Sequence, residues 1–151
     1  MAGAVDRTVS EDVPADPGEV RAHYVDLDNI KDVHPLVVSV VTLHRSEFDD
    51  GYVQTYRVAD RIPLRFLTVP ISYTATVQVP RSGPVLTEAR QFPAVRLDGV
   101  VSFDPIPTGT RLTERIRISA PWPLLSMTAR QAVAAHTEML AGIRRHFESR
   151  C

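Results

Sequence analysis

The sequence has very little cysteine: of its 151 residues, only Cys151 at the last position carries a thiol. A single thiol forms neither an internal disulfide nor a cysteine-based metal site, which excludes disulfide-rich scaffolds, zinc fingers and iron–sulfur proteins. The two histidines expected near the core, His34 and His136, lack the spacing of metal ligands. We therefore expect neither a metal nor any other cofactor.

The sequence also lacks long apolar runs and an excess of charge of one sign. No segment approaches the ~20 apolar residues of a membrane span, and the first residues lack the basic stretch and apolar run of a secretory signal. The formal net charge is −1, so no bulk positive field favours a phosphate backbone. We expect a cytoplasmic protein that binds no nucleic acid and does not insert stably into a membrane.

Signatures of several enzyme classes are missing as well. There is no Gly-x-Ser-x-Gly motif of a hydrolase and no glycine-rich phosphate loop after a strand, which excludes hydrolases, kinases and dinucleotide-dependent enzymes. With 44% hydrophobic and 23% charged residues, the chain can form one sizeable core. Residues 1–151 are expected to form a single domain, as a monomer or a weak homodimer.

The first part of the chain predicts one strand followed by two short helices. The strand lies around Val5–Ser10 and ends before a cluster of prolines. Asp16 is a natural N-cap with proline at the next position, which predicts a helix over Pro17–Val25. A second helical turn over Leu27–Asp32 ends before Pro35, because the residue before a proline disfavours helical geometry.

Six strands are expected next, because β-branched runs alternate with turn residues. The strands cover Val37–Phe48, Tyr52–Ala59, Leu67–Val79, Val85–Phe92, Val95–Phe103 and Thr110–Ser119. The turns between them are Asp49–Gly51, Arg61–Pro63, Arg81–Pro84, Pro93-Ala94 and Pro105–Gly109. Connections of this length indicate an antiparallel meander.

The last segment, Leu124–Arg150, predicts one long amphipathic helix. Residues at helical spacing form a single stripe, consisting of Leu125, Ala129, Val133, His136, Leu140, Ile143 and Phe147. The order of elements is therefore α+β: a strand, two helices, six strands and a helix. We expect a curved seven-stranded antiparallel sheet wrapped around the C-terminal helix, with an internal cavity between them.

Three segments carry a resemblance to a known family. They are Pro14–Val20 (PADPGEV), Leu27–Pro35 (LDNIKDVHP) and Gly109–Thr113 (GTRLT). With the order of elements, they resemble the SRPBCC or START-like superfamily of helix-grip proteins, in particular small bacterial members of the polyketide cyclase/dehydrase and lipid transport type. The resemblance implies a ligand cavity, and His34 stands where many relatives have an aromatic residue before the proline.

Glu114 is the first candidate for a functional side chain. In the last predicted strand it alternates with apolar residues, so it faces the core, where an acid needs a partner or water. If Phe103 pairs with Thr110 across the preceding turn, then Gly99 lies opposite Glu114, with Val101 on the same inner face. Glu114 would then either anchor a ligand or transfer a proton, or would be satisfied structurally.

Glu88 and Arg90 are expected to join Glu114 if the turn at Pro93-Ala94 pairs Phe92 with Val95. A slip of one residue at that turn would place both charged side chains in solvent and leave Glu114 alone, because side chains alternate along a strand. The catalytic candidates are thus Glu114, His136 and Arg90. The residues expected to bind a ligand are His34, Tyr56, Tyr73, Glu88, Arg90, Leu97, Gly99, Val101, Phe103, Leu112, Glu114, Ile116, Trp122, Met127, His136 and Leu140.

Three functions are compatible with these features. The first is binding or transport of a hydrophobic small molecule, such as a lipid, fatty acid or polyketide-like compound, between sheet and helix. The second, which the resemblance implies, is a polyketide cyclase or aromatase catalysing aldol cyclisation and dehydration. The third is a protein-interaction or regulatory module without a ligand, which an exposed apolar patch near Trp122 would favour. Without an unmistakable acid/base pair, the sequence favours a binder over an enzyme.

Overall fold

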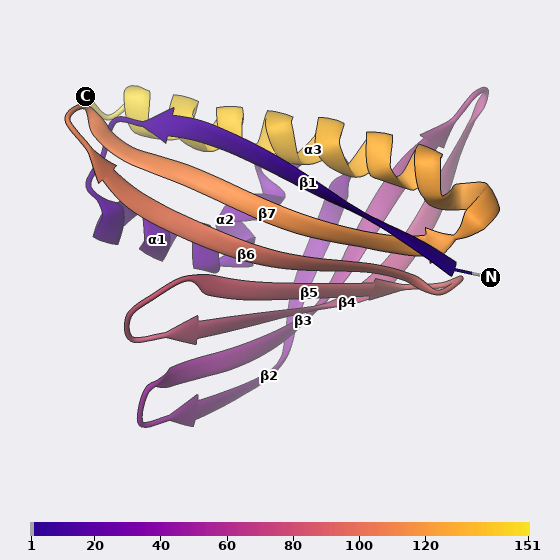
Figure 1. Ribbon diagram of the computed structural model, residues 1–151, viewed down its shortest axis with the longest axis horizontal. Helices are drawn as coiled ribbons and strands as arrows, with labels where there is room; N and C mark the ends of the chain where they lie inside the picture. Colours follow the sequence, from indigo (N-terminus) through magenta and orange to yellow (C-terminus); the bar gives the residue numbers. More distant parts are fainter. Residues whose placement is uncertain (1) are drawn as a thin grey trace.

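A strongly curved sheet grips one long helix in the computed structural model, which describes residues 2–151 with the exception of the Leu64 side chain (Figure 1). In chain order the elements are β1 (Ala2–Val13), α1 (Pro17–Val25), α2 (Leu27–Lys31), β2 (Val37–Phe48), β3 (Gly51–Leu64), β4 (Leu67–Pro80), β5 (Val85–Gln91), β6 (Val95–Ile106), β7 (Gly109–Pro121) and α3 (Trp122–Glu148). The seven strands run in the order β1-β7-β6-β5-β4-β3-β2, and all neighbours are antiparallel. The predicted α+β architecture is confirmed.

The two short helices begin at the expected caps. The Asp16 side chain accepts a hydrogen bond from the backbone N–H of Gly18, and α1 spans Pro17–Val25 as predicted. Asp26 caps α2 in the same way through the N–H of Asp28. Both helices are tied to the main body by buried side chains, which are Val20 and Tyr24 in α1 and Ile30 in α2.

Two strand boundaries differ from the prediction. The first strand is longer than expected, because β1 pairs with β7 along its whole length, from Ala2 to Val13. The turn predicted at residues 61–63 is wrong: β3 continues to Leu64, and the chain reverses through Arg65, which has φ 52°. Pro63 is tolerated in this strand because pairing with β2 ends at Asp60, so that β3 is an edge there.

The core lies between the inner face of the sheet and α3. In β7 the inward residues alternate with exposed arginines, and Leu112 and Ile118 are fully buried. The buried residues of α3 are Leu125, Ala129, Ala132, Ala135, Met139, Leu140, Gly142, Ile143 and Phe147. Most of the predicted stripe is therefore buried, while Val133 and His136 are half-buried.

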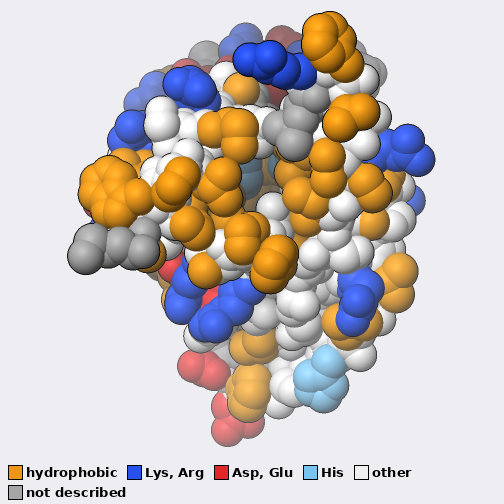
Figure 2. Space-filling view, turned by 90° about the vertical axis from the view of Figure 1, so that its right-hand side faces the viewer, with side chains coloured by type: hydrophobic (Ala, Val, Ile, Leu, Met, Phe, Trp, Pro, Cys, Tyr) orange, Lys and Arg blue, Asp and Glu red, His pale blue; other side chains and the backbone are white. Residues whose placement is uncertain are grey.

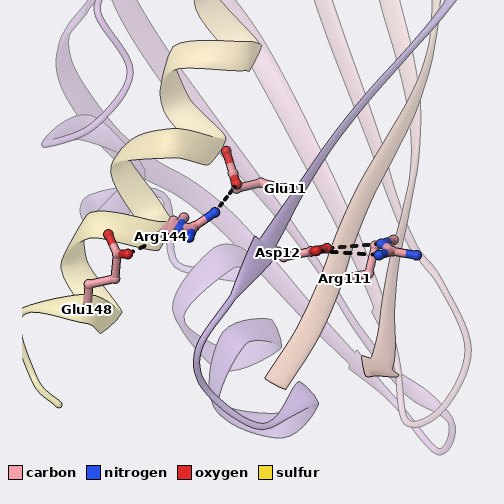
Figure 3. A network of polar contacts seen from close by, with 5 residues as sticks. All are labelled: Glu11, Asp12, Arg111, Arg144 and Glu148. Atoms are coloured by element: carbon pink, nitrogen blue, oxygen red, sulfur yellow. Dashed lines mark hydrogen bonds and ion pairs between the residues drawn. The ribbon is translucent and has the colours of Figure 1, made fainter. Parts of the chain in front are cut away.

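Ion pairs on the surface connect β1 to the elements on both sides of it (Figure 3). Glu11 pairs with Arg144 of α3 at 3.0 Å, and Arg144 also reaches Glu148 at 3.2 Å. Asp12 points the other way and pairs with Arg111 of β7 at 2.9 Å. Adjacent residues of a strand face opposite sides, so two neighbouring acids hold two different elements.

Within residues 2–151, no helix is long and apolar enough to cross a membrane. The same part of the chain contains no group of three or more histidine, cysteine or acidic side chains placed to hold a metal ion.

Candidate functional site

A cavity of about 290 Å³ lies between the sheet and α3. Every element except β1 contributes to its walls, and most of the lining side chains are apolar. The polar exceptions that matter chemically are Tyr24, His34, Asp60, Glu114 and His136. A mostly apolar concavity with a few convergent polar groups is typical of a site for small molecules.

Hydrophobic side chains surround a hollow at one end of the molecule, which is the right-hand end in Figure 1 (Figure 2). Phe92, in the turn after β5, borders the cavity and is 88% exposed. Phe66 in the β3–β4 turn is 98% exposed, and Trp122 at the start of α3 is 61% exposed. Aromatic side chains left in solvent on three separate segments are unusual away from a binding surface.

The β6–β7 hairpin orients Glu114. Its register differs by two residues from the predicted one, because the turn is tighter than expected and Ile106 pairs with Gly109. Val101 rather than Gly99 therefore lies opposite Glu114. A shift of two residues keeps every side chain on its face, so Glu114 still points inward, with 3% of its side-chain surface exposed.

Three side chains from three elements meet at Glu114. Its Oε1 lies 2.8 Å from Nδ1 of His136 on α3, and its Oε2 accepts a hydrogen bond from the hydroxyl of Tyr24 on α1. Burial and the negative charge of Glu114 raise the pKa of Tyr24 well above its ordinary value, so the phenol remains a donor. Both carboxylate oxygens thus have partners, as a buried acid requires.

His136 and His34 lie together in the cavity wall with opposite tendencies to bind a proton. Their rings are nearly perpendicular, with centroids 5.5 Å apart. Burial lowers the pKa of His136, but the charge and hydrogen bond of Glu114 outweigh it and raise the pKa above 6.5. Burial and the neighbouring His136 lower the pKa of His34 to about 4. His34 is therefore neutral near pH 7, and its Nδ1 accepts from the backbone N–H of Leu36 at 3.2 Å.

A second polar group, Asp60, lies on another wall of the cavity. It belongs to β3, opposite Ile71 of β4, and is 6% exposed. Burial raises its pKa to about 6, although the Tyr73 hydroxyl and the charge of His136 act in the opposite direction. Tyr73 also lines the cavity.

The predicted inward cluster of Glu88 and Arg90 with Glu114 is wrong. The turn between β5 and β6 contains three residues, so that Gln91 rather than Phe92 pairs with Val95. This slip by one residue is the alternative considered from the sequence, and it turns both charged side chains outward. Glu88 borders the cavity, but its carboxylate is occupied by Arg90 at 2.6 Å and by Arg96 at 3.0 Å.

Several other predicted ligand contacts lie outside the cavity. Tyr56 is buried and donates its hydroxyl to the carbonyl of Val25 at 3.3 Å, which ties β3 to the end of α1. Trp122 is exposed beyond the walls and packs close to Gly3. The apolar residues that pack in the core without lining the cavity are Val101, Phe103, Leu112 and Leu140. The predicted residues that do line it are His34, Tyr73, Glu88, Leu97, Gly99, Glu114, Ile116, Met127 and His136.

Tyr24 and Asp60 are among the lining residues that were missed as site residues from the sequence. Asp60 had a detectable signal, because it alternates in step with the apolar Val58 and Ile62 and so shares their inner face. Tyr24 lies one helical turn after Val20, on the buried face of α1. Neither pattern predicts which side chain each residue contacts, because Glu114, the partner of Tyr24, and Tyr73, the partner of Asp60, lie on other elements of the fold.

No protein-family model matches this chain, and no curated protein matches it. Solved structures do: the Zhui aromatase/cyclase from Streptomyces sp. R1128 has 14% identity and a TM-score of 0.70, over 99% of this chain and 96% of that chain. The di-domain aromatase/cyclase StfQ of the steffimycin biosynthetic pathway has 14% identity and a TM-score of 0.76, over 97% of this chain and 51% of that chain.

A STAR-related lipid transfer protein from Xanthomonas axonopodis is also similar, with 13% identity and a TM-score of 0.63, over 92% of this chain and 85% of that chain. At these identities the likeness concerns the fold. The chain has the helix-grip fold, as the resemblance in the sequence implied.

Proposed function

We propose that this protein binds a hydrophobic small molecule, such as a lipid, fatty acid or polyketide-like compound, in the cavity between the sheet and α3. The observation that carries the proposal is a cavity of about 290 Å³ with mainly apolar walls and few polar groups. Each Å² of apolar surface that such a ligand buries would contribute roughly 25 cal/mol. The solved structures named for lipid transfer and for cyclisation share this fold and support the same proposal.

The polar network would orient the ligand rather than supply most of the affinity. Both carboxylate oxygens of Glu114 already have partners in Tyr24 and His136, so Glu114 would act on a ligand through His136. With Nδ1 directed at Glu114, the ring leaves Nε2 for a ligand, and 21% of the His136 side-chain surface is exposed. A protonated imidazole at this place would donate a hydrogen bond to a ligand carbonyl or carboxylate.

Native mass spectrometry of the purified protein, with organic extraction of anything bound, tests the proposal directly. Thr128 lines the cavity from α3, and a Thr128→Trp substitution should obstruct the cavity and abolish ligand retention. Ser126→Trp is the matched control, because Ser126 is exposed in the same turns of α3 and does not line the cavity. A protein without bound molecules that also fails to bind added fatty acid or polyketide-like probes would contradict the proposal.

A second candidate is a polyketide cyclase or aromatase, and the pairing of His136 with Glu114 favours it. In an aldol closure an α-carbon loses a proton, a carbon–carbon bond forms to a carbonyl carbon, and the oxygen of that carbonyl gains a proton. Loss of a second α-proton together with the new hydroxyl group then releases water. His136 can exchange protons at Nε2 while Glu114 stabilises its charged form. Conversion of a poly-β-ketone to a cyclised product would support the enzyme. Unchanged affinity and turnover in Glu114→Gln would exclude a role for the acid.

An interaction module without a ligand is the third candidate. The exposed Trp122 favours it, whereas the open interior does not. Trp122 lies outside the cavity wall, so a Trp122→Ser variant should still bind the ligand. If this variant retains the ligand but loses a protein partner, then interaction through Trp122 is separate from ligand binding in the cavity.

A further inference from the structure

Asp60 carries an acceptor atom that the protein itself leaves unused. Its Oδ1 is buried and has no hydrogen-bond partner within residues 2–151. The side chain lines the cavity from β3, between Val58 and Ile62 on the same inner face. Buried carboxylate oxygens almost always have partners, so an orphaned one in a cavity wall marks a place where a partner is missing.

The surroundings of Asp60 offer nothing that replaces this partner. The neighbouring Arg61 is exposed, as expected from its position on the opposite face of the strand. Tyr73 interacts with the carboxyl group from the adjacent strand, and the attraction of His136 reaches it across the cavity. These two groups face Asp60 from β4 and α3, and both leave Oδ1 without a donor.

The chemistry of the missing partner follows from that of the acceptor. A purely apolar ligand, or an ether oxygen, would desolvate Oδ1 without bonding to it, and a carboxylate would be repelled. A hydroxyl or N–H group on an otherwise apolar ligand would donate a hydrogen bond to the Asp60 carboxylate. Hydrogen bonds to a charged acceptor are stronger than those between two neutral groups.

We propose that Asp60 is a specificity-determining ligand contact, and that the cavity selects apolar molecules bearing a hydroxyl or N–H donor over matched molecules without one. The inference rests on the proposed binding function and names the class of ligand that the site takes. It assigns a role to Asp60 on β3, whereas Glu114 lies on β7.

Two aromatic probes of nearly equal shape test this selection. 2-Naphthol carries a hydroxyl donor, and 2-methoxynaphthalene replaces that donor with a methyl ether. Because the ether buries more apolar surface, a cavity without an acceptor would prefer it. By titration calorimetry, the unaltered protein should bind 2-naphthol about tenfold more tightly.

Substitutions at Asp60 locate the origin of the preference. Asp60→Leu replaces the acid with an apolar side chain of similar size and should bring the two affinities within about twofold of each other. Asp60→Asn keeps an acceptor oxygen and should retain part of the preference. Asp104→Leu, an exposed position on β6, is the matched control and should bind both probes as the unaltered protein does. Thermal melts of all variants show that each one is folded.

The outcomes separate this inference from the function on which it rests. Equal binding of the two probes by the unaltered protein, or a preference that survives in Asp60→Leu, overturns the role of Asp60 alone. If neither probe binds although added fatty acid does, the selection by Asp60 is overturned and the proposed binding function stands. If the fatty acid also fails to bind, the proposed function falls together with the inference.

Discussion

Oε1 of Glu114 lies 2.8 Å from Nδ1 of His136, which joins the inner face of β7 to the long helix inside the cavity. This contact favours the protonated form of the imidazole. Burial alone would lower the pKa of His136, but the charge and hydrogen bond of Glu114, with a smaller contribution from the charge of Asp60, raise it above 6.5. A positively charged donor in the wall of an apolar cavity therefore depends mainly on the carboxylate of Glu114.

The first prediction concerns this dependence. In Glu114→Gln the pKa of His136 should fall below 6.5, because burial then acts almost unopposed. The chemical shifts of the ring nitrogens, followed by NMR during a pH titration, measure the change. His34 is an internal reference and should stay neutral above about pH 5, since its pKa is lowered to about 4. Glu138→Gln, at an exposed position on α3, is the control. An unchanged His136 titration in Glu114→Gln would contradict the assignment.

The second prediction concerns the stability that the Glu114 network provides. Glu114→Ala leaves both the Tyr24 hydroxyl and His136 without their acceptor, and should lower the free energy of unfolding by about 3–5 kcal/mol. Tyr24→Phe removes one donor and leaves His136 in place, so it should cost only about 1–2 kcal/mol. Urea denaturation with unchanged m-values measures both effects. Equal losses for the two variants would show that Glu114 is not the centre of the network.

The third prediction is a dependence of stability on pH that originates at Asp60. Burial raises its pKa from 3.8 to about 6, so the folded chain holds this proton more tightly than the unfolded chain does. Stability therefore falls as the pH rises between these two values, by about 3 kcal/mol in total. Asp60→Leu removes the titrating group, and its stability relative to the unaltered protein should rise by that amount between about pH 3 and about pH 8.

Urea denaturation at the two pH values tests the effect of Asp60. Asp104→Leu, where the acid is exposed, should show no comparable rise. A constant difference between Asp60→Leu and the unaltered protein would mean that Asp60 does not carry a raised pKa. An acid that lowers stability yet lines a cavity is the pattern expected of a group placed for binding.

Much of the fold could be predicted from local patterns, because caps and alternation act over a few residues. Asp16 followed by proline gave the bounds of α1, and the alternation in β7 placed Glu114 on the inner face. The number of residues in a turn is harder to predict from the sequence. One additional residue between β5 and β6 was enough to turn Glu88 and Arg90 outward.

The candidate site was harder to predict, because its contacts join distant parts of the chain. Tyr24 and Glu114 are 90 residues apart, and the packing of α1 against β7 brings them together. Asp60 matched the apolar alternation of its strand, but it lay next to residues 61–63, which were interpreted as a turn. A cytoplasmic location, a single domain and a monomeric or weakly dimeric state stay predictions.

The last prediction concerns Gly99, which lines the cavity on β6. A Cβ atom there would lie 2.3 Å from Oγ1 of Thr87 on β5, so the glycine makes room for the threonine side chain. Gly99→Ala should lower the free energy of unfolding by about 1–3 kcal/mol through overpacking. Adding Thr87→Ala should recover most of that loss, and the double-mutant cycle should give a coupling of at least about 1 kcal/mol.

Gly18→Ala is a suitable comparison for Gly99→Ala, because the atom nearest to its added Cβ is Oδ2 of the capping Asp16 at 3.3 Å, and a shift of this carboxylate by a few tenths of an ångström makes room for the methyl group. Alanine also favours helix over glycine, so this variant should be neutral or slightly more stable. Denaturation of the single and double variants measures all of these values. If Thr87→Ala fails to rescue Gly99→Ala, the loss arises from the backbone at Gly99 and not from contact with the threonine side chain.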